Sequence, residues 1–186
     1  MNKLELKEII LEEKNMYVRS NYYSKKFAHQ KRYMIWKYLS YFRKAQYYKE
    51  KVENEFGLKK LYARIKYKLY VRQKNIYGEK CGVEIANDCK LGRRLDIWHG
   101  GVVINADIGD DCIIRGNNVL GNKGLVKFDG MPTLGNGVDV GVGAVLLGNL
   151  LIADRCEIGA NAVVTKSFTE PGTIIVGVPG RILERK

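Results

Sequence analysis

The sequence predicts a parallel β-helix of six-residue repeats, preceded by a basic α-helical region. Two observations support this fold: aliphatic residues recur at every sixth position in the second part, and the composition changes abruptly near residue 80. Residues 1–80 hold 21 Lys and Arg against 8 Asp and Glu, a net charge of +13, whereas residues 81–186 hold 11 against 12. All 12 tyrosines precede residue 80, and 18 of the 20 glycines follow it. We therefore expect two regions, 1–80 and 81–186.

The first region is predicted to form three helices, because its apolar residues recur near helical spacing. The segments are KLELKEIILEEK (3–14), residues 24–51 and residues 58–75. The apolar positions of the second segment are Phe27, Met34, Ile35, Tyr38, Leu39 and Phe42. Those of the third are Leu58, Leu61, Tyr62, Ile65 and Leu69. Gly57 is expected to separate the last two helices, and His29, among lysines, is expected at the surface.

The charge of the first region leaves three interpretations open. The lysines and arginines form a solvated face, bind an anionic membrane surface, or bind RNA. No RRM, KH or zinc-knuckle signature accompanies them, which disfavours nucleic acid. A non-enzymatic alternative therefore remains: a basic lipid- or RNA-binding module carried on a trimeric β-helix.

The four cysteines, Cys81, Cys89, Cys112 and Cys156, include no C-x-x-C pair, and we expect no signal peptide with a cleavage site. They are expected to be buried, reduced thiols of a cytoplasmic protein. No apolar run approaches the roughly 20 residues of a membrane span.

In the second region, the aliphatic residues align in sets with a spacing of six. The sets are Ile85, Leu91 and Ile97; Ile108, Ile114 and Leu120; and Leu134, Val140, Leu146, Ile152, Ile158 and Val164. A triangular coil has six residues on each side: the aliphatic residue points inward and stacks on the next coil, and Asn, Asp and Gly form the turn. Sandwich strands would alternate with period two instead.

Two irregularities interrupt the repeat. The step from Ile97 to Ile108 is eleven residues and contains His99, one of only two histidines. The step from Leu120 to Leu134 is fourteen and contains the excursion loop GNKGLVKFDGMPT, residues 121–133. Irregularities in a regular scaffold favour function at these places.

The second region resembles the serine acetyltransferase-like branch of the hexapeptide acyltransferases, particularly the O-acetyltransferases of bacterial capsule and polysaccharide gene clusters. The matching segments are GVEIANDCKLG, LDIWHGGVVIN, IGDDCIIRGNNVLGNKG, TLGNGVDVGVGAVLLGN, IGANAVVTKS and IVGVPGRIL. The resemblance implies a left-handed β-helix, a homotrimer, and transfer of acetyl from acetyl-CoA to a hydroxyl.

The resemblance also implies roles for individual residues. It makes His99 the general base, since imidazole suits proton transfer at neutral pH. It places Glu84, fifteen positions earlier, as the partner that orients the imidazole, with Asp96 as a competing partner. The residues implied for acetyl-CoA, in a groove between subunits, are Gly143, Ala144, Ala162, Thr165, Lys166 and Arg181. No metal is expected, because a γ-type carbonic anhydrase of this fold needs three zinc-ligating histidines.

Departures from the family bear on the acceptor. Met131 stands where serine acetyltransferases carry a second histidine, and residues 1–80 are too basic and Tyr-rich for their acidic helical domain. We therefore expect a sugar hydroxyl of a surface polysaccharide precursor as the acceptor, with serine in cysteine synthesis as the alternative. The basic region would hold the enzyme peripherally at the inner face of the membrane.

Overall fold

The computed structural model describes residues 1–18, 27–124 and 130–184, which fall into two compact units, Met1–Val83 and Glu84–Lys186. The first unit contains helices α1 (Lys3–Val18), α2 (Phe27–Asn54) and α3 (Gly57–Cys81). The three predicted helices are thus confirmed, and α2 packs against both α1 and α3. Gly57, at φ 57°, is the first residue of α3 and follows the end of α2 at Asn54 by three positions, so the break between these two helices lies where predicted. The side chain of His29 lies outside the described residues.

The packing of α1 on α2 combines apolar burial with one internal ion pair. Ile35, Leu39 and Phe42 of α2 are almost fully buried. Within this core the Arg43 Nη2 atom lies 2.8 Å from Glu13 Oε1. Burial raises the pKa of Glu13, while the Arg43 charge acts in the opposite direction. Removing one partner of such a buried pair leaves an uncompensated charge, so the pair fixes α1 on α2.

The apolar stripe predicted on the third helix is present but exposed. Its residues and their exposed fractions are Leu58 (85%), Leu61 (54%), Tyr62 (54%), Ile65 (51%) and Leu69 (47%). The helix buries Ala63, Lys74, Gly78 and Cys81 instead. Lys74 reaches the core because its ammonium nitrogen lies over the Tyr38 and Phe42 rings, at 6.0 and 5.8 Å. Small residues and one cation therefore form the packed face of α3.

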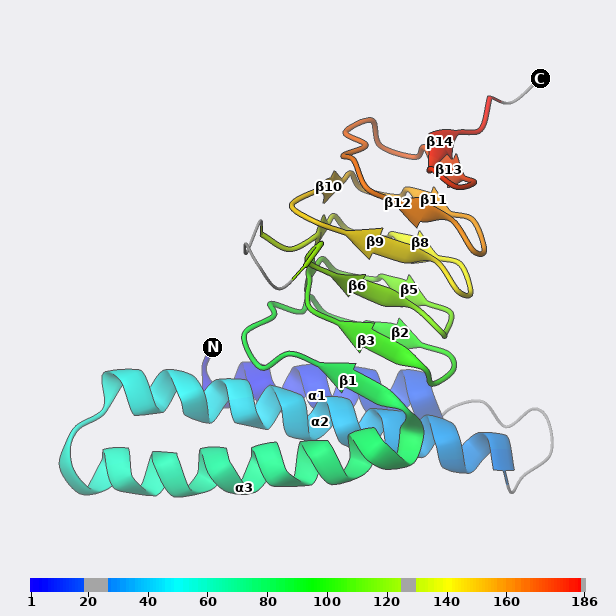
Figure 1. The fold of residues 1–186 in the computed structure, drawn as a ribbon. Coiled ribbons are helices and arrows are strands. Elements are labelled where there is room, and N and C mark those ends of the chain that lie inside the picture. Colours follow the sequence, from blue (N-terminus) through cyan, green and yellow to red (C-terminus); the bar gives the residue numbers. More distant parts are fainter. Residues whose placement is uncertain (19–26, 125–129, 185–186) are drawn as a thin grey trace. The chain divides into compact units, whose positions relative to one another are not determined.

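The second unit is a parallel β-helix with three faces and stacked coils (Figure 1). The first face contains β1 (Val83–Ile85), β3 (Val102–Ile104), β6 (Val119–Gly121), β9 (Val145–Leu147) and β12 (Val163–Val164). The second face contains β4 (Asp107–Ile108), β7 (Thr133–Leu134) and β10 (Leu151–Ile152). The third face contains β2 (Asp96–Ile97), β5 (Ile113–Ile114), β8 (Asp139–Val140), β11 (Glu157–Ile158), β13 (Ile174–Val176) and β14 (Arg181–Ile182). The antiparallel pairing of β14 on β13 ends the ladder.

The predicted aliphatic residues form the core of this unit. On the third face Ile97, Ile114, Val140 and Ile158 stand in register in successive coils. All the predicted positions are buried except Leu91, which is half-buried in the first coil. Because each inward residue packs on its equivalent one coil away, the six-residue period is confirmed as the basis of the fold.

The first irregularity consists of two compensating changes. Ile104 is a further inward residue, paired with Leu120, that the period had not identified. Seven positions separate Ile97 from Ile104, and four separate Ile104 from Ile108. One residue is therefore inserted at the corner containing His99, and the following corner is two residues short. The excursion loop lies between β6 and β7, and its residues 125–129 lie outside those described.

All four cysteines are buried and free, as predicted. Desolvation raises the pKa of both Cys81 and Cys112 to about 11. No helix in the described part of the chain is both long and apolar enough to cross a membrane.

The buried thiols predict a loss of stability at high pH. The unfolded chain ionises its thiols near their ordinary pKa of about 8.5, whereas the folded chain keeps Cys81 and Cys112 protonated to about pH 11. Between these values the unfolded state binds fewer protons, so stability falls by up to ~1.4 kcal/mol per pH unit for each thiol. Calorimetry under reducing conditions should show a falling Tm in this window. Cys112→Ala should flatten the decline, and an equally steep decline in that variant would contradict the assignment.

Candidate active site

His99 lies at the corner where the third face passes into the first, between β2 and β3. Its side chain is exposed in the single chain. The inserted residue of the first irregularity belongs to this corner, so the backbone bulges from the regular coil. The β-helix thus presents an imidazole at its edge.

Gly116, one coil further on, allows this bulge. A Cβ atom at Gly116 would lie 2.7 Å from the Cβ of His99 and 3.3 Å from the carbonyl oxygen of Gly100. Its φ of 121° is also one that side-chain-bearing residues rarely adopt. Only glycine therefore lets the coil pass directly against His99.

Asn118 fixes this glycine from inside the coil. Its side chain is fully buried. Its Oδ1 accepts the backbone N–H of Gly116 at 2.8 Å, and its Nδ2 donates to the carbonyl oxygens of Gly141 and Ala144 at 2.7 and 3.2 Å. The following coils place Ala144 and Ala162 at the corresponding position. Asn118 therefore ties the coil beside His99 to the next one.

A second set of contacts restrains the residue before His99. The Arg115 guanidinium lies 4.4 Å from the centre of the Trp98 ring. Its Nε and Nη2 donate to the two carboxylate oxygens of Asp139 at 2.7 and 2.5 Å, and this pairing raises the pKa of Arg115. Trp98 in turn donates from Nε1 to Asp96 Oδ2 at 3.0 Å. The indole is therefore held between a cation and a carboxylate.

The two predicted partners of His99 do not hydrogen-bond to it within the part of the chain that the structure describes. Asp96 is directed toward Trp98. Glu84 is exposed on β1, which joins β3 through the Ala86 N–H and the Ile104 carbonyl oxygen at 2.9 Å. The role of Glu84 therefore stays a prediction.

The residues predicted to bind acetyl-CoA fall into two groups. Ala144 and Ala162 are fully buried at the corner that follows the third face, so only their backbone is available to a ligand. Gly143 stands at the same corner with φ 72°, and a Cβ there would lie 2.2 Å from Asn161 Oδ1. The backbone of the coil therefore requires glycine at position 143, whether or not a ligand binds there.

The second group lies near the last coil. Lys166 and Arg181 line one hollow of about 470 Å³ together with Phe168 and Thr173. Thr165 is exposed after β12 but is not among the residues that line it. Strand spacing places the His99 corner and the Asn161 corner on the order of 14 Å apart along the β-helix axis.

Sequence reasoning missed Arg115, Gly116 and Asn118. The sequence does mark them: residues 115–118 read RGNN, whereas the equivalent residues 141–144 of the next coil read GVGA, so larger polar residues replace small ones at this corner. Among the described residues, no group of three or more His, Cys, Asp or Glu side chains is placed to hold a metal ion.

No family model matches the chain. Among curated proteins it is similar to the serine acetyltransferase of Synechococcus elongatus, with 43% identity over 107 residues that cover 56% of this chain and 43% of that protein. It is 42% identical over 105 residues to the Mycobacterium tuberculosis serine acetyltransferase, covering 55% and 45% of the two chains. The chain thus spans about half the length of these relatives.

Solved structures extend the likeness to almost the whole chain. Soybean serine acetyltransferase complexed with serine superposes with a TM-score of 0.74 at 23% identity, over 97% of this chain and 70% of that one. A serine acetyltransferase in complex with CoA gives 0.70 at 21%, over 97% and 70%. At this identity the likeness shows the fold, which is the predicted left-handed parallel β-helix with N-terminal helices.

Proposed function

We propose that this chain is an O-acetyltransferase that moves an acetyl group from acetyl-CoA to a hydroxyl. The observation that carries the proposal is the inserted corner, which places His99 on the same edge as the Gly143 and Ala162 corners. In the hollow near the last coil, which Glu170 also lines, Lys166 and Arg181 are the proposed contacts of the phosphate groups. The similarity to serine acetyltransferases supports the same activity.

In the proposed reaction His99 acts as general base. Its imidazole takes the hydroxyl proton while the oxygen attacks the thioester carbonyl. The tetrahedral intermediate collapses, the carbon–sulfur bond breaks, and the imidazolium returns the proton to the leaving thiolate. Free CoA and an acetyl ester result, and the imidazole is neutral again. Gly116 and Asn118 position the imidazole, and Glu84 is the proposed acceptor of its second N–H.

The outer side of the first face supports assembly into a homotrimer. Val103 and Val119 are 43% and 40% exposed, and they stand in register with the half-buried Val145 and Val163. A continuous outward valine column is typical of a surface covered by another subunit. Because His99 lies at the edge of this face, a neighbouring subunit there would complete the site, and a ring of three closes the contact.

L-Serine is the acceptor that the relatives' names favour, and we propose it first. A sugar hydroxyl is the second candidate. It is favoured by Met131, half-buried after the excursion loop, where the serine-acetylating members of the family carry a histidine. A thioether neither donates a proton nor binds a carboxylate, so an uncharged acceptor suits this position.

One incubation tests both acceptors. The full chain is mixed with acetyl-CoA and, separately, L-serine, nucleotide sugars and oligosaccharides, and the products are identified by mass spectrometry. O-Acetylserine is expected. If only an acetylated sugar forms, the acceptor is the sugar hydroxyl and not L-serine. Absence of every acetyl ester, with CoA bound, would contradict acetyl transfer.

His99→Ala should lower kcat by roughly 10²–10⁴, the usual contribution of a general base. The KM for acetyl-CoA should change little, because corner backbone and the Lys166–Arg181 hollow bind it. Light scattering should give an unchanged mass, since the inward aliphatic residues are intact. His29→Ala is the matched control and should turn over normally. Near-normal turnover by the trimeric His99→Ala variant would leave the mechanism without its base.

Gly116→Ala should lower kcat by about 10²-fold, because a displacement on the order of 1 Å at a catalytic group has such an effect. Gly121→Ala is the control: its Cβ would meet only Asn105 Cβ, at an ordinary 3.9 Å. Steady-state kinetics and Tm are measured for both. A Gly116→Ala enzyme as active as Gly121→Ala would show that the close approach does not position His99.

A further inference from the structure

We propose that the exposed stripe of α3 is a docking surface for an anionic lipid bilayer. We define the α3 stripe as Leu58, Leu61, Ile65 and Leu69. At 100° per residue these four lie on one side of the helix, opposite the buried Ala63, Lys74 and Gly78. The stripe is therefore a second apolar face, which stays exposed among the described residues of the helical unit.

The charges around the stripe are all of one sign. Lys59 and Lys66 flank it on one side, and Arg64, Lys68 and Arg72 on the other. Residues 56–78 contain no Asp or Glu. An apolar stripe between two rows of long cationic side chains is the pattern of a helix that lies in the membrane interface, with the leucines among the acyl chains and the cations at the headgroups.

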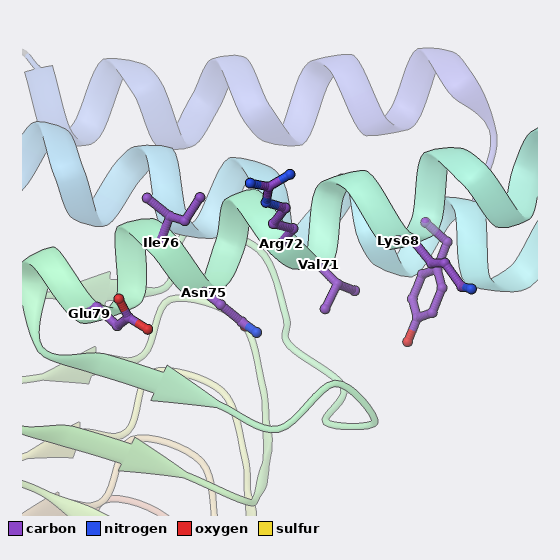
Figure 2. Close-up of a pocket in the computed structure, with 7 residues that line it drawn as sticks. Lys68, Val71, Arg72, Asn75, Ile76 and Glu79 are labelled. Atoms are coloured by element: carbon purple, nitrogen blue, oxygen red, sulfur yellow. The ribbon is translucent and has the colours of Figure 1, made fainter.

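The hollow on α3 continues this pattern beyond Leu69. It has a volume of about 450 Å³, and its lining residues include Lys68, Val71, Arg72 and Ile76, with the acidic Glu79 at the end away from Leu69 (Figure 2). Lys68 and Arg72 precede Glu79 by about three and two helical turns, so the part of the hollow nearer Leu69 matches a phosphate headgroup and the start of its acyl chain.

The same charges disfavour the other occupants. Two copies packed through the α3 stripe would bring five cations of each helix together with no acidic residue in the segment to offset them. RNA would use the cations and could stack a base on the exposed Tyr62 ring beside the stripe, but it would gain nothing from the four exposed aliphatic residues. A bilayer uses both features.

The proposal is tested by sedimenting the full chain with vesicles. One set contains phosphatidylcholine alone, and the other contains equal parts of phosphatidylcholine and phosphatidylglycerol. The wild type should bind only the anionic vesicles, and more weakly as salt rises, because screening shortens to about 8 Å at physiological ionic strength. Leu61→Gln with Ile65→Gln should weaken binding by about tenfold or more, and Arg64→Gln with Lys68→Gln by a similar factor.

The control is Leu4→Gln with Leu11→Gln on α1, which removes two equally exposed leucines from a helix with four acidic and three basic residues. This variant should bind as the wild type does, and circular dichroism should show each variant folded. Three outcomes would overturn the proposal. They are no binding of wild type to anionic vesicles, unchanged binding by the leucine variant, or a smaller assembly of that variant without lipid, which would mean that a second copy covers the stripe.

Discussion

The stacking of inward aliphatic residues, one per side of each coil, is the constraint on which the second unit depends. Ile97, Ile114, Val140 and Ile158 pair directly on one face, and any shift of register would place them outside. A coil that contains an extra residue must therefore extrude it at a corner. The His99 corner shows this effect: β2 and β3 keep their register, and the histidine stands out from the edge. The regularity of the core thus makes the exposed imidazole possible.

The corner after the third face has a second requirement, which is backbone space. Gly101, Asn117, Gly143 and Asn161 all have positive φ there, and each Asn side chain lies where a Cβ on the glycine one coil earlier would be. Glycine and asparagine therefore alternate along the edge. The same small residues leave backbone accessible for an extended ligand, so the packing of the chain and the proposed binding of acetyl-CoA demand the same residues. A glycine at this corner is by itself no evidence of a binding site.

The sequence was sufficient for the coils because their information is local: a six-residue period is visible without knowing which coils touch. It was also sufficient to single out His99 as the irregular position. It did not identify Ile104, because one residue is inserted before Ile104 and two are missing after it. The step from Ile97 to Ile108 therefore looked only one residue short. Gly116 and Asn118 act on His99 and Gly141 across coils, and no spacing within one repeat shows such contacts. The third helix illustrates another limit: helical spacing predicted a stripe, but Ala63 and Gly78 make the packed face, so periodicity alone did not identify the buried side.

The central claim is that the edge with the His99, Gly143 and Ala162 corners, together with the hollow of Lys166 and Arg181 at the last coil, forms a single acetyl-CoA site. A crystal structure of the full chain with CoA tests this most directly. In that structure the phosphates should lie near Lys166 and Arg181, the pantetheine arm should cross the Gly143 and Ala162 corners, and the sulfur should lie beside the imidazole of His99. CoA bound at another face of the β-helix, with its sulfur far from the His99 imidazole, would contradict this claim.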